Sequence, residues 1–246
     1  KLTAKVKLQT LPDQFRALRD TMEAANRCAD WISSEAWKAQ SFRQYDVHKL
    51  DYAEDRRRFR LSAQVTVRAI SKVADAYKLD KKRQRTFRAT GGIAYDARIL
   101  RWMADEVSIW TVAGRIRIPF QSGPRQVELL RTRQGESDLI FQGGEFHLAA
   151  TCNAEQPPLV EFHGYLGIDL GVSNIACDSD GERYSGSQIK SVRHRHRRLR
   201  AKLQRKQTRA AKRRLKKLSG KEARFAKHTN HVISKEIVAS AKRTGR

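Results

Sequence analysis

The first ten residues, KLTAKVKLQT, alternate between apolar and polar side chains. The apolar positions are Leu2, Ala4, Val6 and Leu8. Because successive side chains of a strand point to opposite sides, this period of two predicts a half-buried β-strand with lysines on its open face. Pro12 then marks the start of the next element, since proline is tolerated in the first turn of a helix.

Two stretches then repeat their apolar residues mostly at steps of three and four, with a longer gap in each, which is close to the spacing of one helix face. The first runs from about 12 to 40 and carries Leu11, Phe15, Leu18, Met22, Cys28 and Ile32. The second runs from about 48 to 80 and carries Leu61, Val65, Ile70, Val73 and Tyr77. We predict one helix for each stretch, the second with the basic segment EDRRRFR on its outer face.

Between residues 91 and 153 the pattern returns to alternation, interrupted by turns that contain glycine. EVSIWTV and RIRIPF flank an Ala-Gly turn, and VELLRTRQGESDLIFQGGEFHLAATC supplies further predicted strands. We therefore predict a small β-barrel made of residues 1–10 and 88–153, which the first strand completes. The helices of residues 11–87 are then an insertion in the barrel.

A polar, proline-containing linker at 154–164 leads to a second predicted domain, which begins near Tyr165. YLGIDLG, NIACDSD and ERYSG predict three short strands. Two basic helices follow, and Ser219-Gly220 is predicted to separate them. The first has a leucine stripe of Leu199, Leu203, Leu215 and Leu218, and the second is expected to bury Phe225, Val232, Ile233, Ile237 and Val238. The fold class predicted is α+β with several domains.

The formal net charge of +25 is concentrated at the end of the chain. Residues 190–246 hold 22 Lys and Arg against 2 Asp and Glu, whereas residues 1–189 hold 29 against 24. This excess points to a polyanion as partner, nucleic acid before an anionic membrane surface. No apolar run approaches the roughly 18 residues of a membrane span and no signal peptide is evident, so we expect an intracellular protein without a membrane partner. The three cysteines form no CxxC pair, so no zinc site or disulfide framework is predicted.

The short apolar run YLGI predicts a buried strand, and it stops at a single acid, Asp169. A carboxylate inside a buried strand would lose too much solvation, but at the tip of a strand it can meet a cation. Asp169 followed by Gly171 fits a tight turn that leaves the acid open to a metal ion or a phosphate. Two alternatives remain, a solvated turn residue and the phosphate loop of an actin-like ATPase.

Three consecutive features together resemble one family. GIDLGVSNIACDSDG, an Arg- and Lys-rich helix and FAKHTNHVISKEIVASA resemble the TnpB proteins of transposons and the compact type V CRISPR effectors descended from them. The resemblance covers the whole chain and is specific over 164–240. It implies a wedge barrel (1–10 and 88–153), a helical recognition lobe (11–87) and the first part of a ribonuclease H-like RuvC nuclease domain (165–246).

The resemblance also implies an enzyme, a Mg²⁺-dependent RNA-guided DNA endonuclease. A structured guide RNA and double-stranded target DNA would be its partners, and Mg²⁺ or Mn²⁺ and the guide RNA its cofactors. Asp169 would be a catalytic metal ligand. The expected location is the cytoplasm of a bacterial or archaeal cell, in association with the nucleoid. The resemblance does not decide whether the protein belongs to a transposon or to a CRISPR locus. It also leaves open whether the working unit is a monomer or a homodimer.

The sequence departs from the TnpB pattern in its catalytic acids. The resemblance places a second catalytic Glu and a third Asp beyond residue 246, and the zinc-binding cysteine knuckle is missing. Asp178 and Asp180 lie near Asp169, but CDSDG is typical of a turn. Because one carboxylate cannot fix two divalent cations, we expect these 246 residues to bind nucleic acid without cutting it. Either the chain is a fragment of a longer nuclease or another chain supplies the acids.

Residues 190–228 contain 18 Lys and Arg but a single acid, Glu222. Such helices repel themselves unless phosphates supply the counter-charge, although a solvated charged surface is the alternative. The residues expected to contact the backbone of the guide RNA or heteroduplex are Arg193, Arg197, Arg198, Arg200, Lys202, Arg205, Lys206, Arg209, Arg213 and Arg214. The four histidines of residues 190–246 show no metal-ligand spacing with any cysteine.

Two further sets are candidates for contact with bases. Direct reading of a target-adjacent DNA motif is assigned to polar side chains of the second predicted helix, with ordinary surface polarity as the alternative. They are Ser62, Gln64, Thr66 and Arg68. Aromatic side chains that could stack on bases, if they are not simply core residues, are Trp31, Trp37, Phe42, Tyr45, Trp102 and Trp110.

Two other functions compete with the nuclease. A catalytically inactive RNA-guided DNA binder would have no need of Asp169. A basic structural RNA-binding protein accounts for the charge but not for GIDLG at the tip of a strand.

Overall fold

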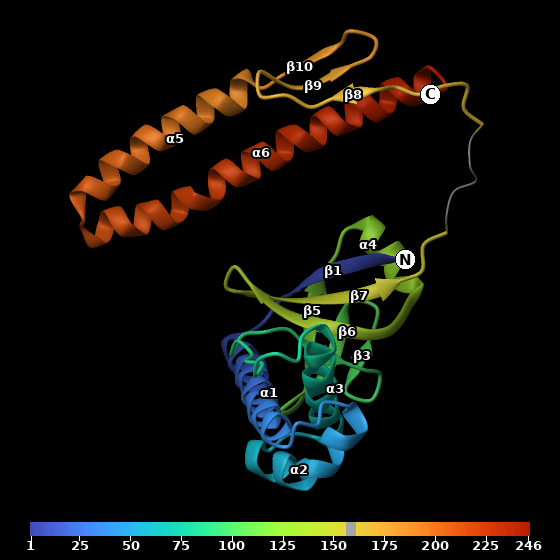
Figure 1. Cartoon of the computed structure of the whole chain (residues 1–246), viewed down its shortest axis with the longest axis vertical. Helices are drawn as coiled ribbons and strands as arrows, with labels where there is room; N and C mark the ends of the chain where they lie inside the picture. Colours follow the sequence, from blue (N-terminus) through green and yellow to red (C-terminus); the bar gives the residue numbers. More distant parts are fainter. Residues whose placement is uncertain (156–160) are drawn as a thin grey trace. The chain divides into compact units, whose positions relative to one another are not determined.

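A computed structural model describes residues 1–155 and 161–246 of the chain. The chain divides into two compact units, Lys1–Gln156 (unit 1) and Pro157–Arg246 (unit 2). Unit 1 combines a curved sheet with helices, and unit 2 combines two long helices with a small sheet (Figure 1). Residues 156–160 of the predicted linker lie outside the described part of the chain.

Unit 1 contains a seven-stranded antiparallel sheet in the order β2-β6-β7-β1-β5-β4-β3. Its strands are β1 (Leu2–Leu8), β2 (Ile93–Tyr95), β3 (Leu100–Trp102), β4 (Glu106–Thr111), β5 (Gly114–Gln121), β6 (Arg133–Gln142) and β7 (Glu145–Cys152). The first strand lies in the middle, paired with β7 on one side and β5 on the other. The predicted part that β1 plays in completing a small barrel is therefore confirmed.

The barrel is nearly closed, and side chains rather than a backbone ladder connect the two ends of the sheet across the remaining gap. Trp102 on β3 donates its indole N–H to the Ser137 hydroxyl on β6, at 3.2 Å. The Tyr95 hydroxyl on β2 donates to the Trp110 carbonyl on β4, at 3.1 Å. Strand β6 also bulges between Arg133 and Ser137, where Gly135 has a φ of 68°. A bulge bends its strand and leaves residues unpaired, so the barrel has an irregular seam here.

Three helices fill the insertion between β1 and β2: α1 (Pro12–Lys38), α2 (Gln44–Phe59) and α3 (Ala63–Leu79). The first predicted helix is confirmed, but the single helix predicted for 48–80 is wrong. Arg60 adopts a left-handed conformation with a φ of 53°, which ends α2. Ser62 then caps α3 by accepting a hydrogen bond from the Val65 amide at 3.3 Å.

The helices and the barrel share one hydrophobic core. Asn26 of α1 is fully buried and donates to the carbonyls of Ala89 (3.2 Å) and Gly91 (2.8 Å), just before β2. The Val112 amide, after β4, donates to the Thr21 hydroxyl of α1 at 3.0 Å. The insertion is thus fixed to the barrel by buried polar contacts as well as by apolar packing.

A short helix, α4 (Pro124–Arg131), connects β5 and β6. The prediction of a strand at the start of VELLRTRQ is therefore wrong. Pro124 suits the first turn of a helix, and Gln126 caps that turn by accepting from the Gly123 amide at 2.6 Å. These local signals outweigh the β-like composition of the stretch.

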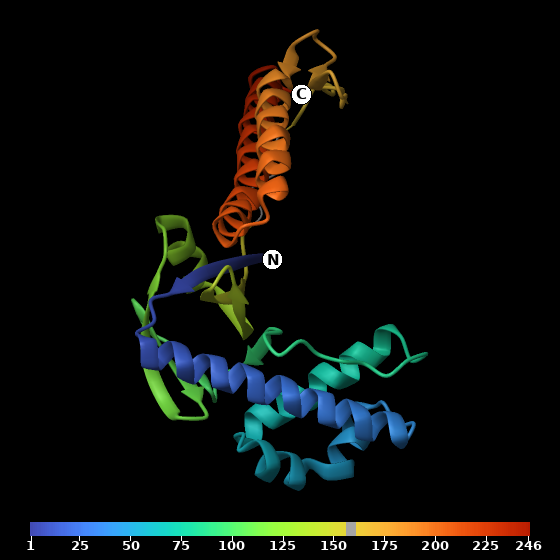
Figure 2. The same ribbon diagram turned by 90° about the vertical axis from the view of Figure 1, so that its left-hand side faces the viewer.

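Unit 2 begins with a three-stranded antiparallel sheet in the order β10-β9-β8, which confirms the three predicted strands. They are β8 (Ile168–Asp169), β9 (Asn174–Asp178) and β10 (Arg183–Ser185). Helices α5 (Ser187–Lys206) and α6 (Arg209–Arg243) follow and lie side by side (Figure 2).

The predicted helix boundary in unit 2 is wrong. The chain turns at Gln207, with a φ of 48°, and Thr208 caps α6 by accepting from the Ala211 amide at 3.2 Å. Ser219 and Gly220 lie inside α6. A glycine within a helix costs only about 1 kcal/mol, which packing against a neighbouring helix readily offsets.

The α5–α6 hairpin buries a narrow apolar stripe. Its buried side chains include Leu203, Ala211, Leu218 and Ile233. Val232 and Val238 were expected to be buried but are 39% and 54% exposed. Two helices cover only one face of each other, so apolar residues outside that face remain open to solvent.

Candidate nucleic-acid interface

Asp169 ends strand β8, where it pairs with Cys177 of β9. The strand is at the edge of the small sheet, and the structure corrects the expectation that it is buried. Ile168 is 38% exposed, Leu170 is 76% exposed, and Asp169 itself is exposed. Nothing in the described part of unit 2 covers this edge, so the carboxylate is open to solvent.

Asp178 is the last residue of β9 and Asp180 lies in the turn that follows, where CDSDG predicts a turn. The buried Asp178 carboxylate accepts the amides of Asp180 (3.1 Å) and Glu182 (2.9 Å). Asp180 is bound by the Arg246 guanidinium, with one contact at 2.8 Å, and this hydrogen bond lowers the pKa of Asp180. Both carboxylates are therefore occupied by the protein.

A divalent metal site needs several oxygen ligands around one point. Among the side chains that the structure describes, no group of three or more His, Cys, Asp or Glu could hold a metal ion. The residues present therefore do not fit Mg²⁺ or Mn²⁺ as a complete site.

The ten predicted backbone-contact residues all lie on the α5–α6 hairpin. Those from Arg193 to Lys206 belong to α5, and Arg209, Arg213 and Arg214 belong to the first turns of α6. Nine of the ten are exposed and Arg200 is half-buried. The hairpin thus presents most of its guanidinium and ammonium groups to solvent.

Glu222 of α6 is the only acid in residues 190–228, and it joins the two helices. Its carboxylate meets Arg200 at 2.7 Å, Arg193 at 3.5 Å and His196 at 3.8 Å, all from α5. Sequence analysis did not assign a role to this acid, although its isolation among basic residues was the available signal. Among the described residues, the other eight predicted contact residues form no ion pair.

The structure gives the four predicted base-reading residues contacts within the protein. Thr66 is fully buried and bonds to the Ser62 carbonyl at 3.1 Å, so its predicted role in contacting bases is wrong. Ser62 caps α3. Gln64 donates to Asp96, and Arg68 pairs with Asp96 and Glu136. Residues two apart point to different sides of a helix, so these four side chains do not form one surface for contact with bases.

The candidate stacking residues separate into three kinds of environment. Trp37 and Phe42 pack against Tyr77 in the core of the insertion. Trp31 lies under the Arg58 guanidinium at 3.9 Å, whereas Tyr45 is 69% exposed. Trp102 and Trp110 are half-buried on the barrel, and the Trp102 indole bonds across the seam to Ser137.

Comparison with known families bears on unit 2. Residues 150–245 match the model of the family OrfB_IS605, described as "Probable transposase". The chain is TnpB-like in this segment. The TnpB-like segment contains Asp169, the small sheet and the α5–α6 hairpin, so the predicted resemblance is confirmed there.

Among solved structures, the chain is similar to a chain of the "Cas12f1-sgRNA-target DNA complex", determined by cryo-EM. The alignment covers 99% of this chain and 71% of that chain, with 14% identity and a TM-score of 0.35. No curated protein matches the sequence significantly. In the described residues, no helix has the length and apolarity needed to cross a membrane.

Proposed function

We propose that this chain binds a structured guide RNA and double-stranded target DNA as part of an RNA-guided DNA endonuclease. The observation that supports the proposal most directly is the exposed basic hairpin within the TnpB-like segment. Unit 1 would be the wedge and recognition part, and unit 2 the first part of a RuvC domain. The working unit is a monomer or a homodimer in this proposal.

The hairpin suits a nucleic-acid backbone for electrostatic reasons. Eight of the ten predicted contact residues have no carboxylate partner among the described residues, so their charges repel one another across α5 and the start of α6. Phosphates would relieve this repulsion and release the counterions bound to the RNA. Arginine, which supplies eight of the ten, offers a planar fork that matches two phosphate oxygens.

We assign Asp169 to the catalytic site as one ligand of Mg²⁺ or Mn²⁺. Bound divalent ions would activate water and stabilise the leaving oxygen of a phosphodiester. Since the described residues do not complete that site, the remaining ligands must come from elsewhere, and the 246 residues by themselves would bind without cutting. Because the described residues contain no complete metal site, an RNA-guided DNA binder that does not cut is the second candidate function.

The first experiment is to purify the chain and sequence the RNA that accompanies it. We expect one discrete structured species joined to a variable, guide-like end. A mixture of ribosomal and transfer RNA would contradict the guide-RNA proposal, because it would show that positive charge alone selects the ligand.

A charge-removal variant tests the hairpin. Replacing Arg197, Arg198, Arg205 and Arg209 by Gln should weaken RNA binding and reduce the slope of log K against log salt by roughly 3, at ~0.7–0.9 per lost contact. Fluorescence anisotropy over a salt series measures both quantities.

The control removes four exposed basic side chains from unit 1: Lys81, Lys82, Arg83 and Arg88. The net charge falls equally in the two variants, so only local contacts distinguish them. If the control reduces the slope as much as the hairpin variant does, RNA binding reflects the net charge and the hairpin has no particular role.

A further inference from the structure

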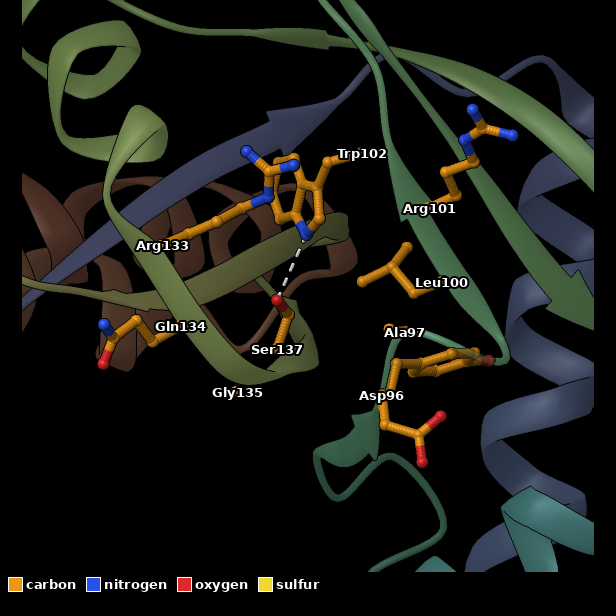
Figure 3. A pocket seen from close by; sticks show the side chains of 10 residues that line it. Asp96, Ala97, Leu100, Arg101, Trp102, Arg133, Gln134, Gly135 and Ser137 are labelled. Atoms are coloured by element: carbon orange, nitrogen blue, oxygen red, sulfur yellow. Dashed lines mark hydrogen bonds between the residues drawn. The ribbon is translucent and has the colours of Figure 1, made fainter.

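The seam of the barrel in unit 1 contains two neighbouring hollows with volumes of about 370 Å³ and 290 Å³. Trp102 and Arg133 line both of them. The first hollow extends along the β6 bulge to Gln134, Gly135 and Ser137 (Figure 3). The second lies toward α4 and is walled by apolar side chains that include Phe120, Val127 and Leu130. Both volumes approach or reach the ~300 Å³ at which ligand pockets begin.

Trp102 is held in a fixed orientation between these hollows. Its indole N–H bonds to the Ser137 hydroxyl at 3.2 Å, shown as the dashed line in Figure 3. The Phe120 ring packs against it edge-on, with centroids 5.4 Å apart and an interplanar angle of 72°. The indole is nevertheless only half-buried. A rigid, partly exposed aromatic ring loses little entropy when a flat ligand stacks on it.

The charges around the two hollows favour an anionic ligand. Arg131 and Arg133 lie at the second hollow, and neither forms an ion pair within the described residues. Arg133 donates one hydrogen bond, to the Leu130 carbonyl at 2.9 Å. Among the described residues, Asp96 is the one acid that lines either hollow, and its carboxylate is already bound by Gln64 and by Arg68, the latter at 3.1 Å.

We propose that the seam binds two adjacent unpaired nucleotides of a single strand, one base in each hollow on either side of Trp102. Arg131 and Arg133 would contact the phosphates, and Gln134 and Ser137 the polar edge of the first base. Bases stacked in a duplex cannot enter such hollows, whereas unpaired bases can be turned out and stacked on aromatic side chains. This inference rests on the proposed function only because it takes nucleic acid to be the partner.

The test uses the full chain and fluorescent ten-nucleotide oligouridine, with an RNA duplex of equal length for comparison. Trp102→Leu should weaken binding of the single strand about tenfold or more without changing the salt slope, because stacking does not involve counterions. Trp102→Phe keeps an aromatic ring and should restore most of the affinity. Arg133→Gln should instead lower the salt slope by ~0.7. Binding of the duplex should be the same in all variants.

The matched control is Trp110→Leu, because Trp110 is also half-buried on the barrel but lines neither hollow. Unchanged affinity in Trp102→Leu would overturn the proposal. So would an equal loss in Trp110→Leu, or a Trp102→Phe variant as weak as Trp102→Leu, since either result would indicate a structural role. Repeating the series with oligothymidine shows whether the seam binds RNA, DNA or both. A loss of affinity in Trp102→Leu for either oligonucleotide, or for both, supports the site.

The outcomes separate this proposal from the proposed function. If the seam variants bind normally while the α5–α6 hairpin variant loses affinity, the guide-RNA proposal stands and the seam proposal is wrong. If Trp102→Leu weakens single-strand binding but no discrete RNA accompanies the purified chain, the seam proposal stands and the guide-RNA proposal is wrong. A wild-type chain that binds neither oligouridine nor oligothymidine overturns the seam proposal, while the guide-RNA proposal is still decided by the RNA that accompanies the purified chain.

Discussion

At the scale of single residues, the structure separates three acids that are close together in the sequence. Asp178 accepts two backbone amides of its own turn and Asp180 is held by Arg246, whereas Asp169 is exposed at a strand tip. A carboxylate already occupied by protein donors is a poor metal ligand, because binding the metal would leave those donors unpaired. Among the described residues, Asp169 is therefore the one acid of the three whose carboxylate accepts no hydrogen bond from the protein, so it remains available to an external cation.

Replacing Asp169 by Ala should leave the affinity for RNA and the stability of the fold unchanged, because the side chain is exposed. In a system that cuts DNA with this chain as a component, the same change should abolish cleavage. Gel-based cleavage in Mg²⁺ and anisotropy of RNA binding measure the two effects. Cleavage retained by Asp169→Ala would show that Asp169 is not a metal ligand, and the Asp180→Ala variant serves as the control that keeps activity.

At the scale of the elements, the two long helices of unit 2 are defined by their turn rather than by their composition. Gln207 and Thr208 reverse the chain, while Gly220 lies within α6, where its neighbours continue the helix. A side-chain methyl added at Gly220 would meet the Arg224 guanidinium at 2.6 Å. Since that guanidinium is the end of a flexible side chain, it can move aside.

Gly220→Ala should therefore stabilise unit 2 by about 0.5–1 kcal/mol, because alanine loses less backbone entropy in a helix interior than glycine does. Helical circular dichroism during urea unfolding measures the change. Gly135→Ala is the opposite control, since its φ of 68° disfavours a side chain and the substitution should destabilise unit 1. A loss of stability in Gly220→Ala would mean that the chain does break at Ser219-Gly220.

At the scale of the whole molecule, each unit has its own source of stability. Unit 1 has a continuous core shared by three helices and a barrel, whereas unit 2 has a thin apolar stripe and an ion cluster around Glu222. Within unit 1, Asn26 links the two parts by donating to the Ala89 and Gly91 carbonyls and accepting from Lys72 at 2.6 Å. Burial lowers the pKa of Lys72, so this ammonium depends on its polar partners.

Asn26→Leu should lower the free energy of unfolding of unit 1 by about 2–3 kcal/mol, because it leaves buried carbonyls unpaired and removes one of the two hydrogen-bond acceptors of the Lys72 ammonium. All four tryptophans lie in unit 1, so tryptophan fluorescence in urea reports on this unit alone. The exposed Asn153→Leu, also in unit 1, is the control and should change the midpoint very little. An equally small effect of Asn26→Leu would show that the insertion and the barrel are joined by apolar packing only.

The sequence by itself determined the features that depend on local periodicity and on charge. The first strand, the first long helix, the three short strands of unit 2 and the basic character of the last helices all follow from spacing within a few residues. The TnpB-like motif is also local, and the family match confirms it over residues 150–245. The identity of the wedge, recognition and RuvC parts stays a prediction.

Only the tertiary structure decided features that depend on what packs against what. Ser62 caps the start of α3, so the helix predicted for 48–80 is two helices, α2 and α3. Thr208 caps the start of α6, so the boundary between α5 and α6 lies there and not at Ser219-Gly220. Thr66 became buried and β8 exposed because burial depends on neighbouring elements that hydrophobic spacing does not identify. The Trp102 seam arises where a bulge in β6 meets the end of β3, two segments about thirty residues apart, and no local pattern encodes that meeting.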